Sequence, residues 1–174
     1  MKELHYLRFA FLDFEASSLG LDSWPIEIGL SWIDQNLEVQ TFESLIRPEP
    51  EWSEEAWSGA SALVHNIPRR DLDAAPDVKA VAAGFLEALD GRIALSDAPP
   101  FERHWLDQLF SAAGVTDHVS IHDFDAITMA AFSPRALDFL YERLERITAP
   151  HRAGADSARF ARGWLAGIHR EGEI

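Results

Sequence analysis

The chain has 174 residues, 47% of them hydrophobic, and a formal net charge of −14 at pH 7. This length and apolar content are enough for one domain with a single sizeable core. Cysteine is absent, which excludes disulfides and cysteine-ligated zinc or iron–sulfur sites. The net acidity argues against a broad nonspecific grip on long polyanions.

Targeting and membrane segments are not indicated by the sequence. The N-terminus has no apolar stretch before a cleavage-like site, and no stretch approaches the ~18 apolar residues of a membrane span. Together with the lack of cysteine, these features favour a cytoplasmic protein that does not bind membranes.

Three strands are expected in the first part of the chain, near residues 6–14, 26–33 and 38–47. They are separated by "SSLGLDSWP" and by the short turn "DQN", so the spacing predicts an antiparallel meander. Two helices are expected next, at 54–64 and 74–89. The second has apolar residues at helical spacing, and "DG" ends it.

Strands and helices alternate in the second half. "RIALSD" predicts a short strand, and prolines open an amphipathic helix at 99–114 that ends at Gly114. The other expected elements are a strand at 118–124, a helix at 133–147 and a last helix at about 152–168. This order predicts a single α/β domain, with a mixed sheet flanked by helices.

The first predicted strand carries two carboxylates in a run that otherwise reads as buried. Alternate side chains of a strand share one face, so Asp13 and Glu15 point the same way. Two ionised carboxylates this close repel each other and resist losing water. Either the strand ends at a solvent-exposed rim, or the pair binds divalent cations such as Mg²⁺ or Mn²⁺, which prefer oxygen ligands.

Spacing alone leaves the start of the last helix open. Asp156 shares a stripe with Phe160 and Trp164 at four-residue spacing. An aspartate there is also typical of a solvated first turn, and His151 could be an ordinary surface histidine.

The aromatic and basic residues admit two interpretations. Base stacking is conceivable for the tryptophans, but core packing is favoured for Trp57, Trp105 and Trp164 because they lie on apolar helix faces. The pattern does not place Trp52. The arginines that could hold phosphates, or be only solvated charges, are Arg103, Arg152, Arg159 and Arg162.

Four segments occur in an order and spacing that resemble a known family: "LDFEASSLG", "PIEIG", "SDAPPFERHWL" and "HRAGADSARFA". They resemble the motifs of 3′–5′ exonucleases with an Asp-Glu-Asp-Asp active site and a histidine base. That superfamily includes ribonuclease T, oligoribonuclease and the proofreading subunits of bacterial replicative polymerases. "LVHNI" at 63–67 also resembles a linking segment that often contains His-x-Ile. The resemblance covers most of the chain and implies one ribonuclease-H-like domain over residues 1–174, with a five-stranded mixed sheet flanked by helices.

The resemblance also implies a catalytic site. Asp13, Glu15 and Asp156 would bind two Mg²⁺ or Mn²⁺ ions, one activating water and the other stabilising the leaving oxygen. His151 would accept the proton of the attacking water, because imidazole exchanges protons near neutral pH. The residues implied to cradle the terminal nucleotide are Ala16, Ser17, Ser18 and Leu19, although this segment could also be a plain turn.

One position departs from the family pattern. Relatives usually have aspartate directly after a phenylalanine, and here Glu102 follows Phe101. The longer side chain could hold a metal or a metal-bound water, with Asp97 and Asp107 as nearby alternatives. Retained activity, altered metal preference and lost catalysis are all compatible with the change. We favour retained activity because the other four positions are intact.

The leading prediction is a metal-dependent 3′–5′ exonuclease acting on single-stranded or short nucleic acid. The alternative is a catalytically weak exonuclease-like module that binds nucleic acid or a protein, and a third hypothesis is a metallo-phosphoesterase acting on small nucleotides. The sequence does not decide between RNA and DNA. A protein partner or a homodimer is also compatible with it.

Overall fold

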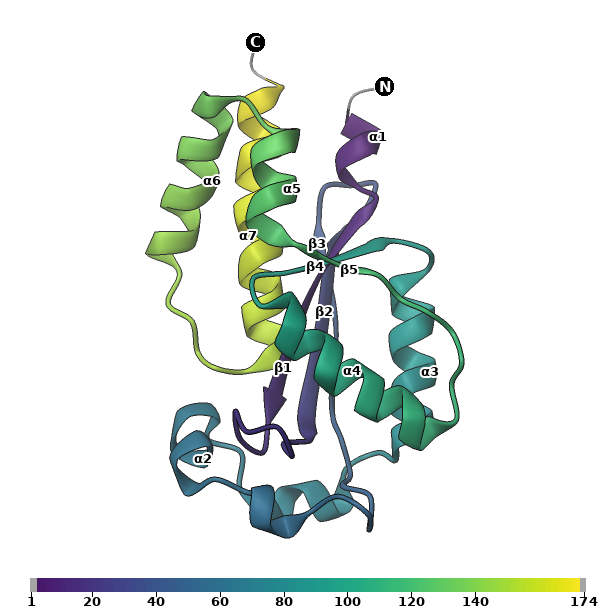
Figure 1. Cartoon of the computed structure of the whole chain (residues 1–174). Coiled ribbons are helices and arrows are strands. Elements are labelled where there is room, and N and C mark those ends of the chain that lie inside the picture. The colour runs from purple at the N-terminus through teal and green to yellow at the C-terminus, as the bar shows by residue number, and fades with distance from the viewer. Residues whose placement is uncertain (1–2, 173–174) are drawn as a thin grey trace.

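The computed structural model describes residues 3–172 and is built around one five-stranded mixed β-sheet (Figure 1). Its spatial order is β3-β2-β1-β4-β5. The strands are β1 (Phe9–Ala16), β2 (Pro25–Ile33), β3 (Val39–Leu45), β4 (Ile93–Ser96) and β5 (Ile121–Asp123). β1, β2 and β3 form an antiparallel meander, and β4 and β5 run parallel to β1. The predicted fold class is therefore confirmed.

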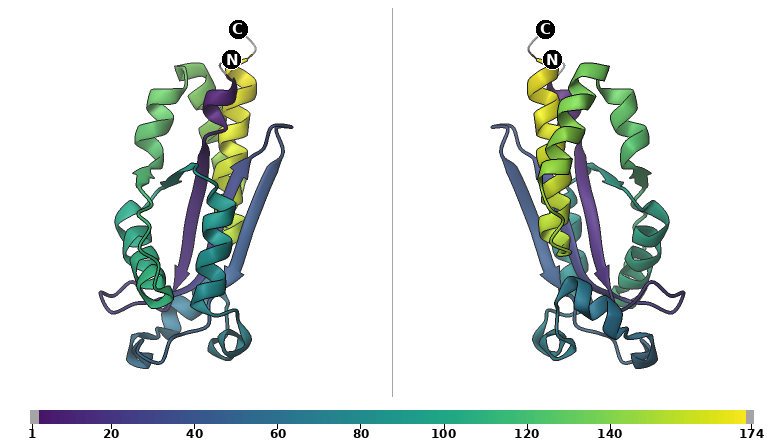
Figure 2. Two further views of the ribbon diagram at one scale, coloured as in Figure 1. Left: turned by 90° about the vertical axis from the view of Figure 1, so that its right-hand side faces the viewer. Right: turned by 90° about the vertical axis from the view of Figure 1, so that its left-hand side faces the viewer.

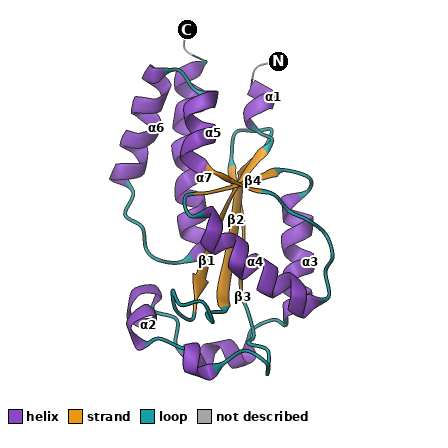
Figure 3. Ribbon diagram, viewed as in Figure 1, coloured by secondary structure: helices purple, strands orange, loops and turns teal. Residues whose placement is uncertain are grey.

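Helices lie on both faces of this sheet and at its end (Figure 3). The α-helices are α1 (Glu3–Tyr6), α2 (Gly59–His65), α3 (Val78–Leu89), α4 (Pro99–Ala113), α5 (Phe124–Ala131), α6 (Pro134–Arg146) and α7 (Ala153–Glu171). Two 3₁₀ turns, η1 (Glu54–Ala56) and η2 (Arg69–Ala74), flank α2. None of the helices described in residues 3–172 is long and apolar enough to cross a membrane.

The two faces of the sheet build two separate apolar clusters. Figure 2 shows α3 against one face and α7 against the other. Leu12 and Phe14 of β1 belong to the cluster with α3 and α4. Phe9 and Phe11 belong to the cluster with α5, α6 and α7, where their rings lie 5.1 and 5.5 Å from that of Trp164. β1 is apolar on both faces because both are covered.

Several of the expected elements differ from the structure. The helix expected at 74–89 begins only at Val78, because Asp77 caps it by accepting the Ala80 N–H. The helix expected at 54–64 is wrong as one element, because residues 57 and 58 are extended and Ser58 caps a new helix by accepting the Ser61 N–H. The strand expected at 118–124 shrinks to β5. Its pairing with β4 begins only at Ile121, opposite Ala94, and at the other end Asp123 accepts the Ala126 N–H and starts the unexpected α5. The first strand begins later than expected and continues to Ala16, which keeps Glu15 within it.

The tryptophans serve the core, as expected. Trp105 and Trp164 are buried, and the partly buried Trp57 packs on a third cluster at the end of the sheet. Trp52, which the sequence did not place, stacks on Trp24 of that cluster with ring centroids 5.8 Å apart.

Candidate active site

The carboxyl end of β1 carries Asp13 and Glu15 on the face that α7 covers. Both side chains are half-buried, so the strand does not end at a fully exposed rim. β4 pairs with β1 only along Phe9–Phe11, which leaves the last part of β1 open on that side. On the other side β2 continues, with Gly29 opposite Asp13 and Glu27 opposite Glu15.

α4 brings Glu102 to this end of β1. Its side chain is only 3% exposed, and its carboxyl hydrogen-bonds the backbone of Phe14. Of the two alternatives, Asp107 is exposed and pairs with Arg103 at 2.9 Å, so it belongs to the surface of α4. Asp97 is exposed but near enough for its charge to act on Asp13 and Glu102.

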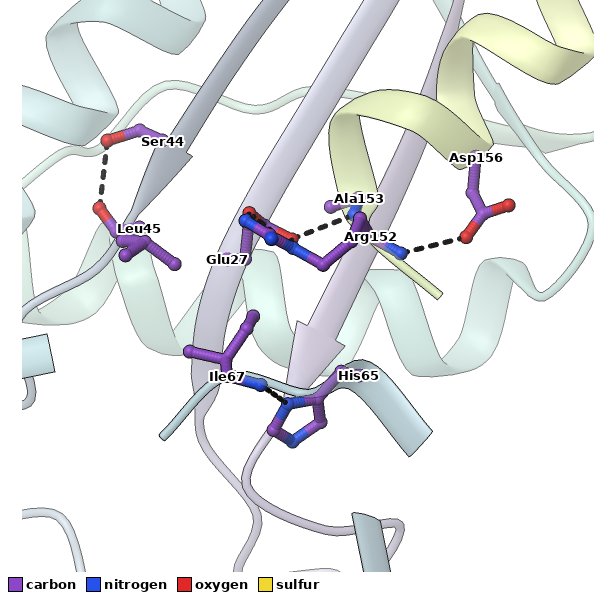
Figure 4. Close-up of polar contacts among 8 residues, drawn as sticks. All are labelled: Glu27, Ser44, Leu45, His65, Ile67, Arg152, Ala153 and Asp156. Atoms are coloured by element: carbon purple, nitrogen blue, oxygen red, sulfur yellow. Dashed lines mark hydrogen bonds and ion pairs between the residues drawn. The ribbon is translucent and has the colours of Figure 1, made fainter. Parts of the chain in front are cut away.

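The first turn of α7 adds Asp156, and the preceding residues add His151. Asp156 is 7% exposed, and its Oδ2 accepts the Arg152 backbone N–H at 3.0 Å (Figure 4). His151 is exposed and has the left-handed backbone angle φ +54°. Glu15, His151 and Asp156 each offer a ligand atom, and these atoms lie within 4.8 Å of one another.

Burial and mutual repulsion raise the pKa of the gathered carboxyls. The pKa of Asp13 lies well above its usual range because of burial first, and then because of the charges of Glu15 and Asp156. Burial, followed by the charge of Asp13, does the same to the pKa of Glu102. The pKa of Glu15 rises to about 7, again mainly through burial. Burial also raises the pKa of Asp156, against the hydrogen bond from Arg152.

Among the described residues, Glu15, His151 and Asp156 offer ligand atoms close enough together for a divalent cation, and Asp13 and Glu102 lie near enough to interact electrostatically with Glu15. Within the described part of the chain, Glu102 Oε2 and Asp156 Oδ1 are buried and have no hydrogen-bond partner. Unpaired buried carboxylate oxygens are costly, and a bound cation removes that cost together with the repulsion. Clustered oxygen donors are the ligands that Mg²⁺ and Mn²⁺ prefer.

A pocket of about 210 Å³ opens beside Glu15 and His151. Its lining residues are Glu15, Ala16, Ser18, Leu19, Ser61, Val64 and His151. Three of the four residues expected to contact the nucleotide, Ala16, Ser18 and Leu19, therefore line this pocket. Ser17 does not: its side chain is buried and accepts the Trp24 N–H at 3.0 Å, so it holds the turn that follows β1.

Three of the four candidate phosphate-binding arginines are engaged within the fold. Arg103 binds Asp107 and the Val119 carbonyl, and Arg159 donates to the carbonyls of Leu144 and Ile147. Arg152 pairs with Glu27. Arg162 is exposed on α7.

Sequence reasoning missed Glu27. It lies in the middle of the buried strand β2, is 2% exposed and binds Arg152 and the N-terminus of α7 (Figure 4). The signal was available in "PIEIG", where an acidic residue interrupts an apolar strand just as Asp13 does in the first strand.

The His-x-Ile segment is also structural. His65 is buried, and its Nδ1 accepts the Ile67 N–H at 3.0 Å (Figure 4). Burial lowers the pKa of its imidazole. The histidine therefore fixes the end of α2, which carries the pocket residues Ser61 and Val64.

Comparisons with solved structures show the same fold. Escherichia coli exonuclease I in complex with a dA16 oligonucleotide has a TM-score of 0.66 and 17% identity, over 95% of this chain and 41% of that one. A full-length 3′-exonuclease has a TM-score of 0.64 and 17% identity, over 94% and 83%. The zinc-bound complex of E. coli exonuclease I with single-stranded DNA has a TM-score of 0.59 and 13% identity, over 95% and 40%. The chain spans about two fifths of the exonuclease I chains.

Sequence comparison gives the family. No curated protein matches the chain in sequence. A family model of the RNase T type, described as an exonuclease, matches residues 10–162, which include all five positions that the motifs indicated. The chain belongs to this exonuclease family.

Proposed function

We propose that this chain is a metal-dependent 3′–5′ exonuclease that hydrolyses terminal phosphodiester bonds of single-stranded or short nucleic acid. One observation carries the proposal. Glu15 of β1, His151 and Asp156 of α7 offer ligand atoms within 4.8 Å of one another. Asp13 and Glu102 are near enough for their charges to act on each other and on Glu15, and two buried carboxyl oxygens have no partner in the described residues. Folding does not otherwise favour such a cluster of buried acids.

Asp13, Glu15, Glu102 and Asp156 would hold two Mg²⁺ or Mn²⁺ ions. In such sites the ions activate a water molecule and stabilise the leaving oxygen. The ligands come from three separate elements, which fixes their positions through the packing of the sheet against α4 and α7. Glu102 has one rotatable bond more than the aspartate that relatives usually have at this position, so it can adapt its reach to the metal more than that aspartate could.

His151 would act as the general base, taking a proton from the attacking water at a ring nitrogen. Its ring lies within reach of Glu15 and Asp156, at the mouth of the site. Because it is exposed, the imidazole can return that proton to solvent after each turnover.

The terminal nucleoside would occupy the pocket beside Glu15. Leu19 is 74% exposed and Val64 48% exposed, so both can pack against an unstacked base. The oligonucleotide in the exonuclease I complex supports nucleic acid as the ligand. Most of the candidate arginines bind groups within the fold, and the net charge is −14, so the chain has few cationic side chains to bind phosphates. This favours single-stranded or short substrates.

Degradation assays test the proposal. RNA and DNA oligonucleotides labelled at the 5′ end are incubated with Mg²⁺, Mn²⁺ or EDTA, and products are resolved by length. We expect stepwise shortening from the 3′ end that EDTA and Asp156→Asn abolish. Cleavage that continues at the same rate in EDTA, or cleavage at internal bonds of the oligonucleotide, would refute the proposal.

The glutamate at position 102 favours one second candidate, a module that binds nucleic acid or a protein partner without efficient catalysis. Binding of a labelled oligonucleotide with no degradation in either metal would support that candidate. Hydrolysis restricted to mononucleotide diesters would indicate a phosphoesterase of small nucleotides instead.

A further inference from the structure

We propose that Glu27 and Arg152 are positioning residues, whose ion pair fixes His151 and the first turn of α7 against β1. The inference rests on the proposed function for its kinetic consequence. Its structural part, that Glu27 holds the backbone at Arg152 in place, does not depend on the proposed function.

Both oxygens of Glu27 are engaged at the N-terminus of α7 (Figure 4). Oε1 accepts from Arg152 Nη2 at 2.5 Å, and Oε2 accepts from Arg152 Nε at 3.0 Å and from the Ala153 backbone N–H at 2.9 Å. Charge-assisted contacts of this kind are about twice as strong as neutral ones. A carboxylate at a helix N-terminus also stabilises the helix dipole.

These contacts separate Glu27 from the metal-binding carboxyls. Glu102 and Asp156 each keep a buried oxygen without a partner in the described residues, whereas Glu27 has donors on both oxygens. Glu27 is therefore built to hold the protein chain and not a cation.

Arg152 is held at three points. Glu27 binds its guanidinium, Asp156 Oδ2 accepts its N–H at 3.0 Å, and its carbonyl accepts the Asp156 N–H at 2.8 Å. His151 precedes it directly and has φ +54°, a conformation that costs energy for a non-glycine residue and persists only when its surroundings hold it. Fixing Arg152 thus fixes the backbone that carries the proposed general base.

The rest of α7 has independent contacts with β2. A Cβ at Gly29 would lie 2.1 Å from the Ala153 carbonyl carbon, so β2 and α7 touch there backbone to backbone. Ser31 Oγ lies 2.9 Å from Ser157 Oγ. Glu27, Gly29 and Ser31 share one face of β2. Loss of Glu27 therefore loosens the first turn and His151 while α7 stays docked.

Glu27→Ala, His151→Ala and their double variant test the kinetic step in the full chain. A displacement of a catalytic group by 1 Å costs about 100-fold in rate, so we expect Glu27→Ala to lower kcat about 100-fold with little change in KM. In the His151→Ala background the same change should cost less than about 10-fold, because the general base it positions is gone and only its effect on Asp156 remains. An equal loss in both backgrounds would overturn the proposal.

Glu43→Gln is the matched control. Its carboxylate lies against Gly154 near the same helix end, but it makes no hydrogen bond to Arg152 or Ala153 among the contacts of the described residues. We expect its kcat within about 2-fold of the unmodified protein, which separates the ion pair from a general effect of local charge.

Amide hydrogen exchange tests the structural step without activity. In Glu27→Ala the Arg152 amide, which binds Asp156 and not Glu27, should exchange at least about 10-fold faster, while the Trp164 amide further along α7 stays within about 2-fold. Unchanged Arg152 exchange, or equal acceleration along all of α7, would contradict the proposal. If the unmodified protein proves inactive, the proposed function fails while this measurement still decides the role of the pair.

Discussion

Replacing Glu15 by glutamine should stabilise the metal-free protein above neutral pH. The pKa of Glu15 rises from 4.5 to about 7 in the folded chain, mainly through burial and then through the charges of Asp156 and Glu27. Between these two values the folded state retains a proton that the unfolded state has released. Stability must therefore fall as pH rises from 4.5 to 7.

The magnitude follows from the size of the pKa rise. About 2.5 pKa units at 1.36 kcal/mol each set a ceiling of about 3.4 kcal/mol. Glu15 is partly exposed, so solvent screening reduces this, and we expect Glu15→Gln to gain about 1.5 to 2 kcal/mol at pH 8. Glutamine has nearly the same volume, so packing changes little.

Urea unfolding in EDTA at pH 4.5, 6 and 8 measures this gain. The variant and the unmodified protein should be about equally stable at pH 4.5 and diverge towards pH 8. Added Mn²⁺ should reverse the order of stability, because only the unmodified protein keeps the carboxylate that we propose as a metal ligand. The exposed Glu87→Gln on α3 is the control and should follow the unmodified protein. Equal stability of Glu15→Gln and the unmodified protein at pH 8 would refute the reasoning.

Three further changes test other parts of the site. His151→Ala should lower kcat by 100-fold or more and flatten the acidic limb of the pH–rate profile, with Mn²⁺ affinity unchanged by calorimetry; an unchanged profile would remove His151 from the mechanism. Glu102→Ala should lower kcat about 1,000-fold, whereas Glu102→Asp should retain activity and shift the metal preference from Mn²⁺ towards Mg²⁺, which demands stricter geometry. Equal rates for both variants in both metals would place Glu102 outside the site. Gly29→Ala should destabilise the fold by about 3 kcal/mol or more in urea unfolding, because its Cβ would overlap the backbone of α7; a smaller loss would mean that α7 moves away freely.

The sequence was sufficient for features that depend on local pattern. Alternation placed Asp13 and Glu15 on one face, and turn signals separated the strands of the meander. The ordered motifs then indicated the fold and family. The shared face and the strand boundaries follow from residue period and turn chemistry, which neighbouring residues determine, whereas the family followed only from the resemblance of the motifs.

Other features depend on contacts between distant segments. Glu27 acquires its partner only because β2 lies beneath the start of α7, a contact across 125 residues. Ser17 accepts a hydrogen bond from the Trp24 N–H and does not line the pocket beside Glu15, and α5 starts where the side chain of Asp123 accepts the Ala126 N–H. Alternation and helical spacing carry no information on such pairings.

Anomalous diffraction from a crystal soaked in Mn²⁺ with a mononucleotide tests the central claim most directly. We expect two Mn²⁺ peaks about 3.5–4 Å apart, ligated by Asp13, Glu15, Glu102 and Asp156, with the base of the nucleotide in the pocket beside Leu19. Crystals that take up the nucleotide but show no Mn²⁺ among these four carboxylates would contradict the claim that this site is a metal-dependent exonuclease centre.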